Sequence, residues 1–436
     1  MNKPLVDNMI LISLDALKAD DIEILKKLPN FSLLMNYGVF AKRVKTIYPS
    51  LTYPAHTTIV TGNYPKKHGI INNKLLKPSN NLCPWFWYRK YIKTPTLYDA
   101  AKENNLTVAS IFWPVSANSS IKYNMPEVFS YKKYITQEMS SLLSGSITYQ
   151  LKLFRKYSNI KKGIKEPELD NFALACAVDT IKSYKPNLLM VHLLDLDTQR
   201  HDYGTNSPEA YEALKRHDTR IGKLITTLKE VNLFDKTNFI VLGDHGFQDF
   251  NKIIYVNNLF KKEGLLITDK NNKILRWKAY LKSCDGSAYI YINDPSDKLL
   301  LDKVKNLLDS LASNSENRIK SIYNNNQLTS LGCDPHAAFM LEAEKGFAFS
   351  EKINTNSIIS SSKNAKSLTG THGYSPENPN LDTFFMASGP AFKKGYFIDN
   401  MNLIDIAPTL AKALNIDFYQ CDGKSIDDFF IEKVRN

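Results

Sequence analysis

The chain has 436 residues, of which 43% are hydrophobic and 23% charged, and its formal net charge is +12. This composition is typical of a folded globular protein and argues against a disordered or fibrous chain. No run approaches the roughly 18 apolar residues of a membrane helix, and no secretory signal is visible. We therefore expect a protein without a membrane span that works in the cytoplasm.

The positive charge favours anionic ligands such as phosphate esters. The densest basic cluster consists of Lys152, Arg155, Lys156, Lys161, Lys162 and Lys165. This cluster carries no recognised nucleic-acid motif and is typical of a solvated helix face. We therefore expect a small phosphorylated substrate and no nucleic acid as partner.

Short apolar runs alternate with amphipathic segments along the chain. Buried strands are predicted at residues 8–14, 108–112, 188–194, 239–242, 288–292 and 384–387. Helices are predicted between them, for example at residues 97–103 and 209–231. This alternation favours an α/β fold with a largely parallel central sheet.

Two regions interrupt the alternation. Residues 74–166 are rich in aromatic side chains, Ser and Lys, and residues 250–368 contain further strand-like runs and polar patches. We interpret both as insertions that cover the sheet or form a wall of the site. No flexible linker separates them, so residues 1–436 are predicted to form one catalytic domain with two inserted regions.

Acidic residues follow three of the predicted strands. Asp15 comes directly after the first strand, Asp197 after the run that ends at residue 194, and Asp244 and His245 after the run that ends at residue 242. Ligand sites in parallel α/β sheets form beyond the carboxyl ends of the strands. These side chains are therefore predicted to meet at one edge of the sheet.

The same residues, with two further histidines, have the spacing of metal ligands. Asp197 and His201 are four apart and can face one ion from a helical turn, while His372 lies between two glycines in a loop that can bend close to an ion. The five cysteines are scattered without a CxxC pair, and zinc without thiolates favours imidazole and carboxylate. Three carboxylates and three imidazoles are enough for two Zn²⁺ ions.

Thr52 is the candidate nucleophile, since a coordinated divalent cation can favour the alkoxide of a threonine hydroxyl. The segment after it can begin a helix, whose first N–H groups favour a phosphate dianion. A plainer interpretation is that Thr52 only caps that helix. Taken alone, Thr52 fits the cap better than the nucleophile.

Taken together, these segments resemble the nucleotide pyrophosphatase/phosphodiesterase family of the alkaline phosphatase superfamily. The resemblance rests on Thr52-Tyr53-Pro54, on Thr61-Gly62 followed by Tyr64-Pro65 and His68-Gly69-Ile70, and on Asp244-His245-Gly246 after a strand. It covers nearly the whole chain and implies an alkaline phosphatase-like three-layer sandwich with inserted cap elements.

The resemblance also implies a role for each residue. Asp197, His201 and His372 match the ligands of one zinc ion, and Asp15, Asp244 and His245 match those of the other. Thr52 matches a nucleophile that also contacts the second ion and forms a phosphothreonine-type intermediate. The implied activity is hydrolysis of phosphodiester or nucleotide pyrophosphate bonds.

Two positions depart from the family pattern. Relatives that cleave nucleotides commonly have Asn three residues after the nucleophile, where Ala55 stands here. They also hold the base between two aromatic rings, and here the expected substrate-binding pair is Tyr53 and His192 in place of a second Tyr. The identity of the substrate is therefore open.

Three alternatives to the phosphodiesterase remain. A phosphonoacetate hydrolase also uses a threonine and two zinc ions. A phosphomonoesterase would need an arginine on the dianion, for which Arg200 is the nearest candidate in sequence. A phosphate-ligand binding protein on the same scaffold would keep the ligands without turnover. The sequence carries no indication of the oligomeric state.

Overall fold

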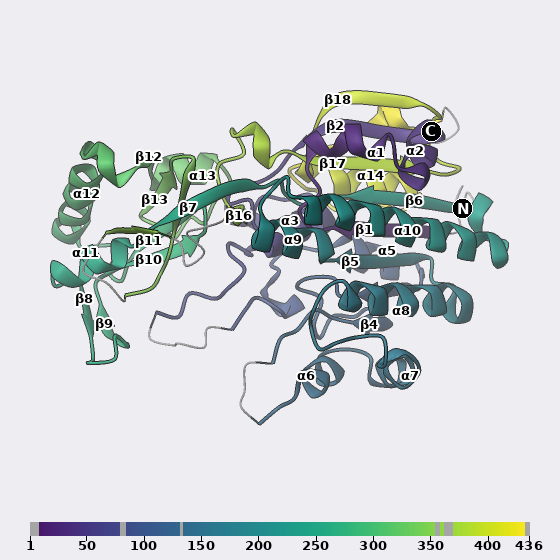
Figure 1. Cartoon of the computed structure of the whole chain (residues 1–436), viewed down its shortest axis with the longest axis horizontal. Coiled ribbons are helices and arrows are strands. Elements are labelled where there is room, and N and C mark those ends of the chain that lie inside the picture. Colours follow the sequence, from purple (N-terminus) through teal and green to yellow (C-terminus); the bar gives the residue numbers. More distant parts are fainter. Residues whose placement is uncertain (1–7, 79–83, 131–133, 354–357, 362–368, 432–436) are drawn as a thin grey trace.

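The computed structural model describes residues 8–78, 84–130, 134–353, 358–361 and 369–431. An eight-stranded sheet forms the centre of the larger lobe (Figure 1). Its strand order is β18 (Tyr396–Asn402), β2 (Gly38–Lys45), β17 (Thr383–Ser388), β6 (Thr237–Leu242), β1 (Asn8–Leu14), β5 (Leu188–Leu193), β3 (Val108–Ile111) and β4 (Tyr123–Met125).

The sheet is mostly parallel. β1 pairs in parallel with both β5 and β6, and β3 pairs in parallel with β4 and β5. β17 is antiparallel to both of its neighbours, β2 and β6. This topology confirms the predicted α/β fold and brings the carboxyl ends of β1, β5 and β6 to one edge.

Helices cover both faces of this sheet and give the three layers that the resemblance implied. On β1, Met9 and Leu11 point into the core beneath α3 (Thr52–Thr61), α5 (Leu97–Glu103) and α14 (Ile406–Ala413). Ile10 and Ile12 alternate with them and pack toward α2 (Pro29–Asn36), α8 (Glu168–Tyr184) and α10 (Pro208–Glu230). Strand side chains alternate between faces, so a strand buried on both faces is apolar throughout. In the described residues, no helix is both long and apolar enough to cross a bilayer.

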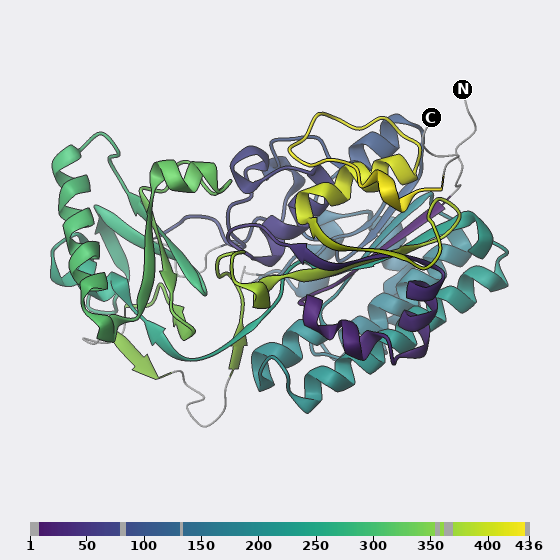
Figure 2. The same ribbon diagram turned by 90° about the horizontal axis from the view of Figure 1, so that it is seen from above.

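The second predicted insertion forms a smaller lobe, seen on the left of Figures 1 and 2. Its antiparallel sheet has the order β10 (Ala279–Cys284), β11 (Ser287–Ile292), β13 (Phe339–Ala343) and β12 (Ile319–Asn324). Its helices are α11 (Val256–Lys262), α12 (Lys298–Ser313) and α13 (Asn325–Ser330). The predicted strand at 288–292 is therefore β11 of this lobe and does not belong to the central sheet.

The first predicted insertion is only partly separate from the central sheet. Residues 74–166 contribute α5, β3 and β4 to the sheet and its covering layer. The remaining helices, α6 (Gln137–Ser144) and α7 (Ile147–Tyr157), lie beside β4 and α8 at the lower edge of Figure 1. The boundaries predicted for this insertion were therefore too wide, because they included an edge of the sheet.

Candidate active site

The strand exits converge as predicted. Asp15 follows β1, and Asp244 and His245 follow β6, the neighbour of β1 in the sheet. One ligand atom from each of the three lies within 4.8 Å of those from the other two, and all three side chains are buried. We call this group the β1–β6 triad.

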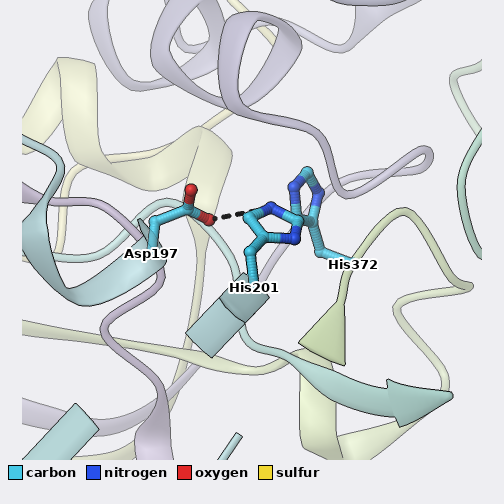
Figure 3. Close-up of side chains that lie close together, drawn as sticks. All are labelled: Asp197, His201 and His372. Atoms are coloured by element: carbon cyan, nitrogen blue, oxygen red, sulfur yellow. Dashed lines mark ion pairs between the residues drawn. The ribbon is translucent and has the colours of Figure 1, made fainter. Parts of the chain in front are cut away.

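A second triad is built from α9 (Asp195–Tyr203) and the loop after β16 (Thr369–Thr371). Asp197 and His201 lie one turn apart on α9, with His201 Nε2 3.4 Å from Asp197 Oδ1 (Figure 3). His372 joins them from the position directly after β16, a strand that packs against α9. A Cβ on Gly370 would lie 2.7 Å from the Arg200 carbonyl oxygen of α9, so only glycine permits this approach. We call this group the α9 triad.

Each histidine of the two triads presents the same nitrogen to the site. Nδ1 of His201 lies 3.0 Å from the Gly370 carbonyl oxygen, and Nδ1 of His372 lies 3.0 Å from that of Ser50. Nδ1 of His245 lies 3.1 Å from the carbonyl oxygen of the next residue. A carbonyl only accepts, so Nδ1 carries the hydrogen and Nε2 keeps its lone pair, which is the usual arrangement of a metal-binding histidine.

The ionisation of the triads also suits cations. Burial lowers the pKa of His245 to about 3 and holds that of His372 well below its usual value, so both imidazoles are neutral. Burial, followed by the nearby charge of Asp244 and then of Asp197, raises the pKa of Asp15. Bringing these carboxylates together without a cation is therefore unfavourable.

Several carboxylate oxygens of the triads lack a hydrogen-bond partner among the described residues. They are Oδ1 of Asp15, Oδ2 of Asp244 and Oδ1 of Asp197, and all are buried. A buried charged oxygen without a partner is costly unless it binds a cation. Together with the Nε2 lone pairs of the histidines, these oxygens fit two divalent cations, one in each triad.

Thr52 lies at the start of α3, next to the β1–β6 triad. The residue that caps the helix is Leu51, and Thr52 is the first helical residue, with no side-chain capping bond at this end. Its Oγ1 lies 3.4 Å from Nε2 of His245, and the side chain is 8% exposed. The plainer interpretation of Thr52 as a helix cap is therefore wrong, and its hydroxyl faces the candidate metal site.

Both triads open into a cavity of about 920 Å³ between the two lobes. Thr52 and members of both triads, Asp15, Asp197, His201 and His372, line it. Further out, the wall carries Trp85, Trp87 and Phe129 from the larger lobe and Tyr280, Glu351 and Lys352 from the smaller one. The cavity is large enough for a ligand well beyond a single phosphate group.

The predicted substrate-binding pair does not lie on this wall. Tyr53 and His192 are both fully buried and do not line the cavity. Instead, the Tyr53 hydroxyl donates to Glu127 Oε1 (3.0 Å), and His192 lies between Glu127 Oε2 (2.9 Å) and Asp15 Oδ2 (3.1 Å). This placement argues against a stacking pair and makes both side chains supports of the β1–β6 triad.

Glu127 is a site residue that the sequence interpretation missed. It lies two residues past the end of β4, a parallel strand of the central sheet, and it lines the cavity. The strand-exit rule that found Asp15 applies here too. The signal was hidden because β4 has three residues and leaves no recognisable apolar run.

Ala55 does not face the cavity either. It is fully buried in the core beneath α3, so a larger amide there would point away from a substrate. Asn73, which the sequence interpretation passed over, does line the cavity. Its Oδ1 accepts the backbone N–H of Tyr53 (2.9 Å), which leaves its amide NH₂ as the donor beside Thr52.

Among the described residues a third histidine–carboxylate group has metal-like spacing, formed by Asp170, Asp195 and His217. Its centre is filled by guanidinium groups: Arg220 Nη1 lies 2.9 Å from Asp195 Oδ2 and Arg216 Nε lies 2.7 Å from the same oxygen. Two backbone N–H groups at the start of α9 donate to Asp170 (2.9 and 3.1 Å). This group therefore holds the beginning of α9 and leaves no room for an ion.

The fold and the two triads define an alkaline phosphatase-like protein, with histidine and aspartate clusters at one edge of an α/β sheet. The sequence model of the type I phosphodiesterase / nucleotide pyrophosphatase family matches residues 9–375 of this chain. The chain belongs to this family, as the sequence motifs predicted.

Among curated relatives, human ectonucleotide pyrophosphatase/phosphodiesterase family member 1 is 25% identical over 430 residues, covering 93% of this chain and 40% of the relative. Venom phosphodiesterase 2 of Crotalus adamanteus is 24% identical over 422 residues, covering 94% of this chain and 45% of the relative. The chain thus spans less than half the length of these relatives.

A similar fold is found in murine ectonucleotide pyrophosphatase/phosphodiesterase 5, solved as an inactive threonine-to-alanine variant in complex with AMP. The TM-score is 0.68 at 19% identity, and the match covers 98% of this chain and 100% of that one. At this identity the likeness establishes the shared fold.

Proposed function

We propose that the chain is a metal-dependent hydrolase of phosphodiester or nucleotide pyrophosphate bonds, with two Zn²⁺ ions and Thr52 as nucleophile. Asp197, His201 and His372 would hold one ion, and Asp15, Asp244 and His245 the other. The observation that carries the proposal is the position of Thr52, whose hydroxyl oxygen lies 3.4 Å from His245 Nε2 on the wall of the cavity.

Divalent cations in the two triads would supply positive charge for the alkoxide of Thr52 and for the oxygens of the phosphoryl group. The protein supplies the geometry. The helical backbone of α3 fixes Thr52, and Asn73 lines the cavity with its oxygen already bonded to the Tyr53 N–H, so its amide NH₂ would be the group that donates to a non-bridging phosphate oxygen. Attack by Thr52 on phosphorus would form a covalent phosphothreonine ester and expel the alcohol or nucleotide leaving group.

The aromatic wall supports a substrate with a planar or apolar group beyond the phosphate. Trp85 and Phe129 line the cavity with ring centroids 5.5 Å apart. Lys74 lies beside Trp85, with its ammonium 5.5 Å from the ring centroid. The AMP bound to the structural relative, and the loss of activity of its threonine-to-alanine variant, support a nucleotide-like ester and a nucleophilic threonine.

A phosphomonoesterase would need an arginine that binds the phosphate dianion, and Arg200 does not fit this role. Arg200 is 1% exposed and does not line the cavity, so its guanidinium cannot contact a phosphate group there. Comparison of bis-p-nitrophenyl phosphate, p-nitrophenyl phosphate and a nucleotide p-nitrophenyl ester under zinc tests this point. The diester and the nucleotide ester should be cleaved faster, and a monoester preference of about tenfold or more would overturn the diesterase assignment.

Replacing Thr52 with Ala should abolish turnover and leave zinc bound, because the two triads keep all their ligands. Thr57→Ala is the matched control: Thr57 is buried on the same helix, and its hydroxyl donates to the Tyr53 carbonyl (2.8 Å) without lining the cavity. Retention of most activity in Thr52→Ala would remove Thr52 from the mechanism. Equal loss in both variants would indicate damage to α3 instead.

A further inference from the structure

Arg200 is one of the largest fully buried side chains among the described residues. It belongs to α9, between the ligand positions Asp197 and His201, yet its side chain points away from the cavity. Nε donates to the Thr205 carbonyl (3.1 Å), Nη2 to Asp21 Oδ1 (2.6 Å), and Nη1 to the Ala16 carbonyl. One guanidinium thus ties the helix of the α9 triad to the loop that follows β1.

Ala16 is the point where this tie meets the other triad. It follows Asp15 directly and has a left-handed backbone, with φ of 65°. Its carbonyl accepts from Arg200, and its N–H donates to Asp244 Oδ1 (3.1 Å). A chain of two hydrogen bonds through one residue therefore joins α9 to the β1–β6 triad.

The hydrogen bonds of Arg200 to Asp21 and Ala16 form a strong link for a single side chain. Asp21 is 2% exposed and forms a buried ion pair with Arg200, and removing one partner of such a pair strongly destabilises a protein because the other charge is left buried and unpaired. The planar guanidinium reaches three acceptors at once, which a lysine ammonium on its flexible stem cannot do with the same geometry. The spacing between α9 and the β1 loop is therefore held by directional bonds as well as by packing.

We propose that Arg200 is a positioning residue that fixes the separation of the two metal-binding triads. The inference rests on the proposed two-metal function. The side chain does not line the cavity and belongs to neither triad; it would hold the α9 triad at a set distance from Asp15 and Asp244 through Ala16. Phosphoryl transfer by paired ions requires a separation of about 3.5–4 Å, so a small shift between the triads should be felt in the chemical step.

The test is the double variant Arg200→Met with Asp21→Asn. It removes the bonds from Arg200 to Ala16 and Asp21 without leaving Asp21 as an unpaired buried charge. The full-length protein is loaded with Mn²⁺, whose spin coupling reports the distance between two ions. We expect two bound ions with altered coupling, binding of the second ion weakened about tenfold, and kcat lowered about tenfold. KM for the diester should change by less than about threefold, because no substrate contact is lost.

Two further variants are compared with the double variant and the wild type. Arg200→Lys keeps the positive charge beside Asp21, so its spin coupling and kcat should lie between those of the double variant and the wild type. If the double variant does not fold, Arg200→Lys replaces it in the comparison with the wild type. Arg43→Met is the matched control, since Arg43 pairs with Asp20 of the same loop (2.8 Å) without contacting Ala16. It should leave the coupling unchanged.

Spin coupling and second-ion affinity within about twofold of the wild type in the Arg200 variants, with only a lower Tm, would overturn the proposal and leave Arg200 a stabilising residue. Failure of the wild type to bind two ions or to cleave any ester would instead overturn the proposed function. The two failures are distinguishable because the wild type is measured first.

Discussion

Nε2 of His192 lies 3.1 Å from Oδ2 of Asp15 in the buried floor of the site. On its other side the imidazole meets Glu127, so it stands between two carboxylates. Burial lowers the pKa of His192, but the hydrogen bonds to Asp15 and Glu127 outweigh it and raise the pKa well above its usual value. His192 thus orients a candidate metal ligand in the way that carboxylate–histidine pairs support metal sites in other proteins.

Replacing Glu127 with Gln should therefore weaken the β1–β6 triad. The neutral amide no longer matches the charge of His192, and the orientation of Asp15 loosens. We expect the affinity for the metal ion of the β1–β6 triad to fall about 10- to 100-fold, measured by chelator competition. We expect kcat to fall by a similar factor, measured by diester hydrolysis. Glu138→Gln, which removes an exposed carboxylate paired with Lys161, is the control and should change neither. An unchanged metal affinity in Glu127→Gln would contradict this role.

Removal of metal should destabilise the folded chain as well as stop turnover. Without cations, burial and the nearby charge of Asp244 keep the pKa of Asp15 raised, even though the hydrogen bond and the charge of His192 act to lower it, and His245 is neutral. Dialysis against a chelator should lower Tm, and Zn²⁺ should restore it together with activity. A Tm and an activity that do not respond to the chelator would contradict the assignment of the triads as a metal centre.

The buried ion-pair cluster behind α9 should matter for stability. Asp195 is fully buried and pairs with Arg216 and Arg220, and although burial opposes ionisation, the hydrogen bond from Arg216 and nearby positive charges lower its pKa to about 2. Asp195→Asn should reduce the free energy of unfolding by about 3–5 kcal/mol, measured in urea. Asp309→Asn, in an exposed pair with Lys305, should cost less than about 1 kcal/mol. Equal effects of the two changes would refute the cluster's role.

His68 should make stability fall in mild acid. Burial lowers its folded pKa to about 3, while the unfolded value is near 6.5, so between these values the unfolded state binds more protons. His68 alone should therefore lower the free energy of unfolding by about 2 kcal/mol between pH 6.5 and pH 5, in addition to the contributions of the buried histidines of the triads, whose pKa is also lowered. His68→Asn should show a correspondingly flatter pH dependence.

Much of the site could be predicted from sequence because it lies at strand exits. The exits of β1, β5 and β6 carry Asp15, Asp197 and Asp244 at or close to the end of an apolar run, and parallel pairing brings these ends together. The bounds of β1 and α5 agree with the prediction residue for residue. The catalytic and metal-binding roles of these residues stay predictions that the geometry supports.

The parts that could not be predicted depend on which way a side chain faces. β11 is buried on both faces, and such a strand has the apolar sequence of a central parallel strand even though it lies in the antiparallel sheet of the smaller lobe. Tyr53 and His192 carry rings that suit stacking, but their burial beneath the cavity follows from packing around Glu127. Arg200 likewise turns away from the site because Asp21 and Ala16 hold it.

The stereochemical course at phosphorus shows whether Thr52 forms a covalent intermediate. A phosphodiester made chiral at phosphorus with sulfur is hydrolysed in heavy-oxygen water, and the configuration of the product is determined. Attack by Thr52 followed by attack of water gives two in-line displacements, so we predict retention of configuration. Inversion would show a single displacement by water and would contradict a covalent role for Thr52.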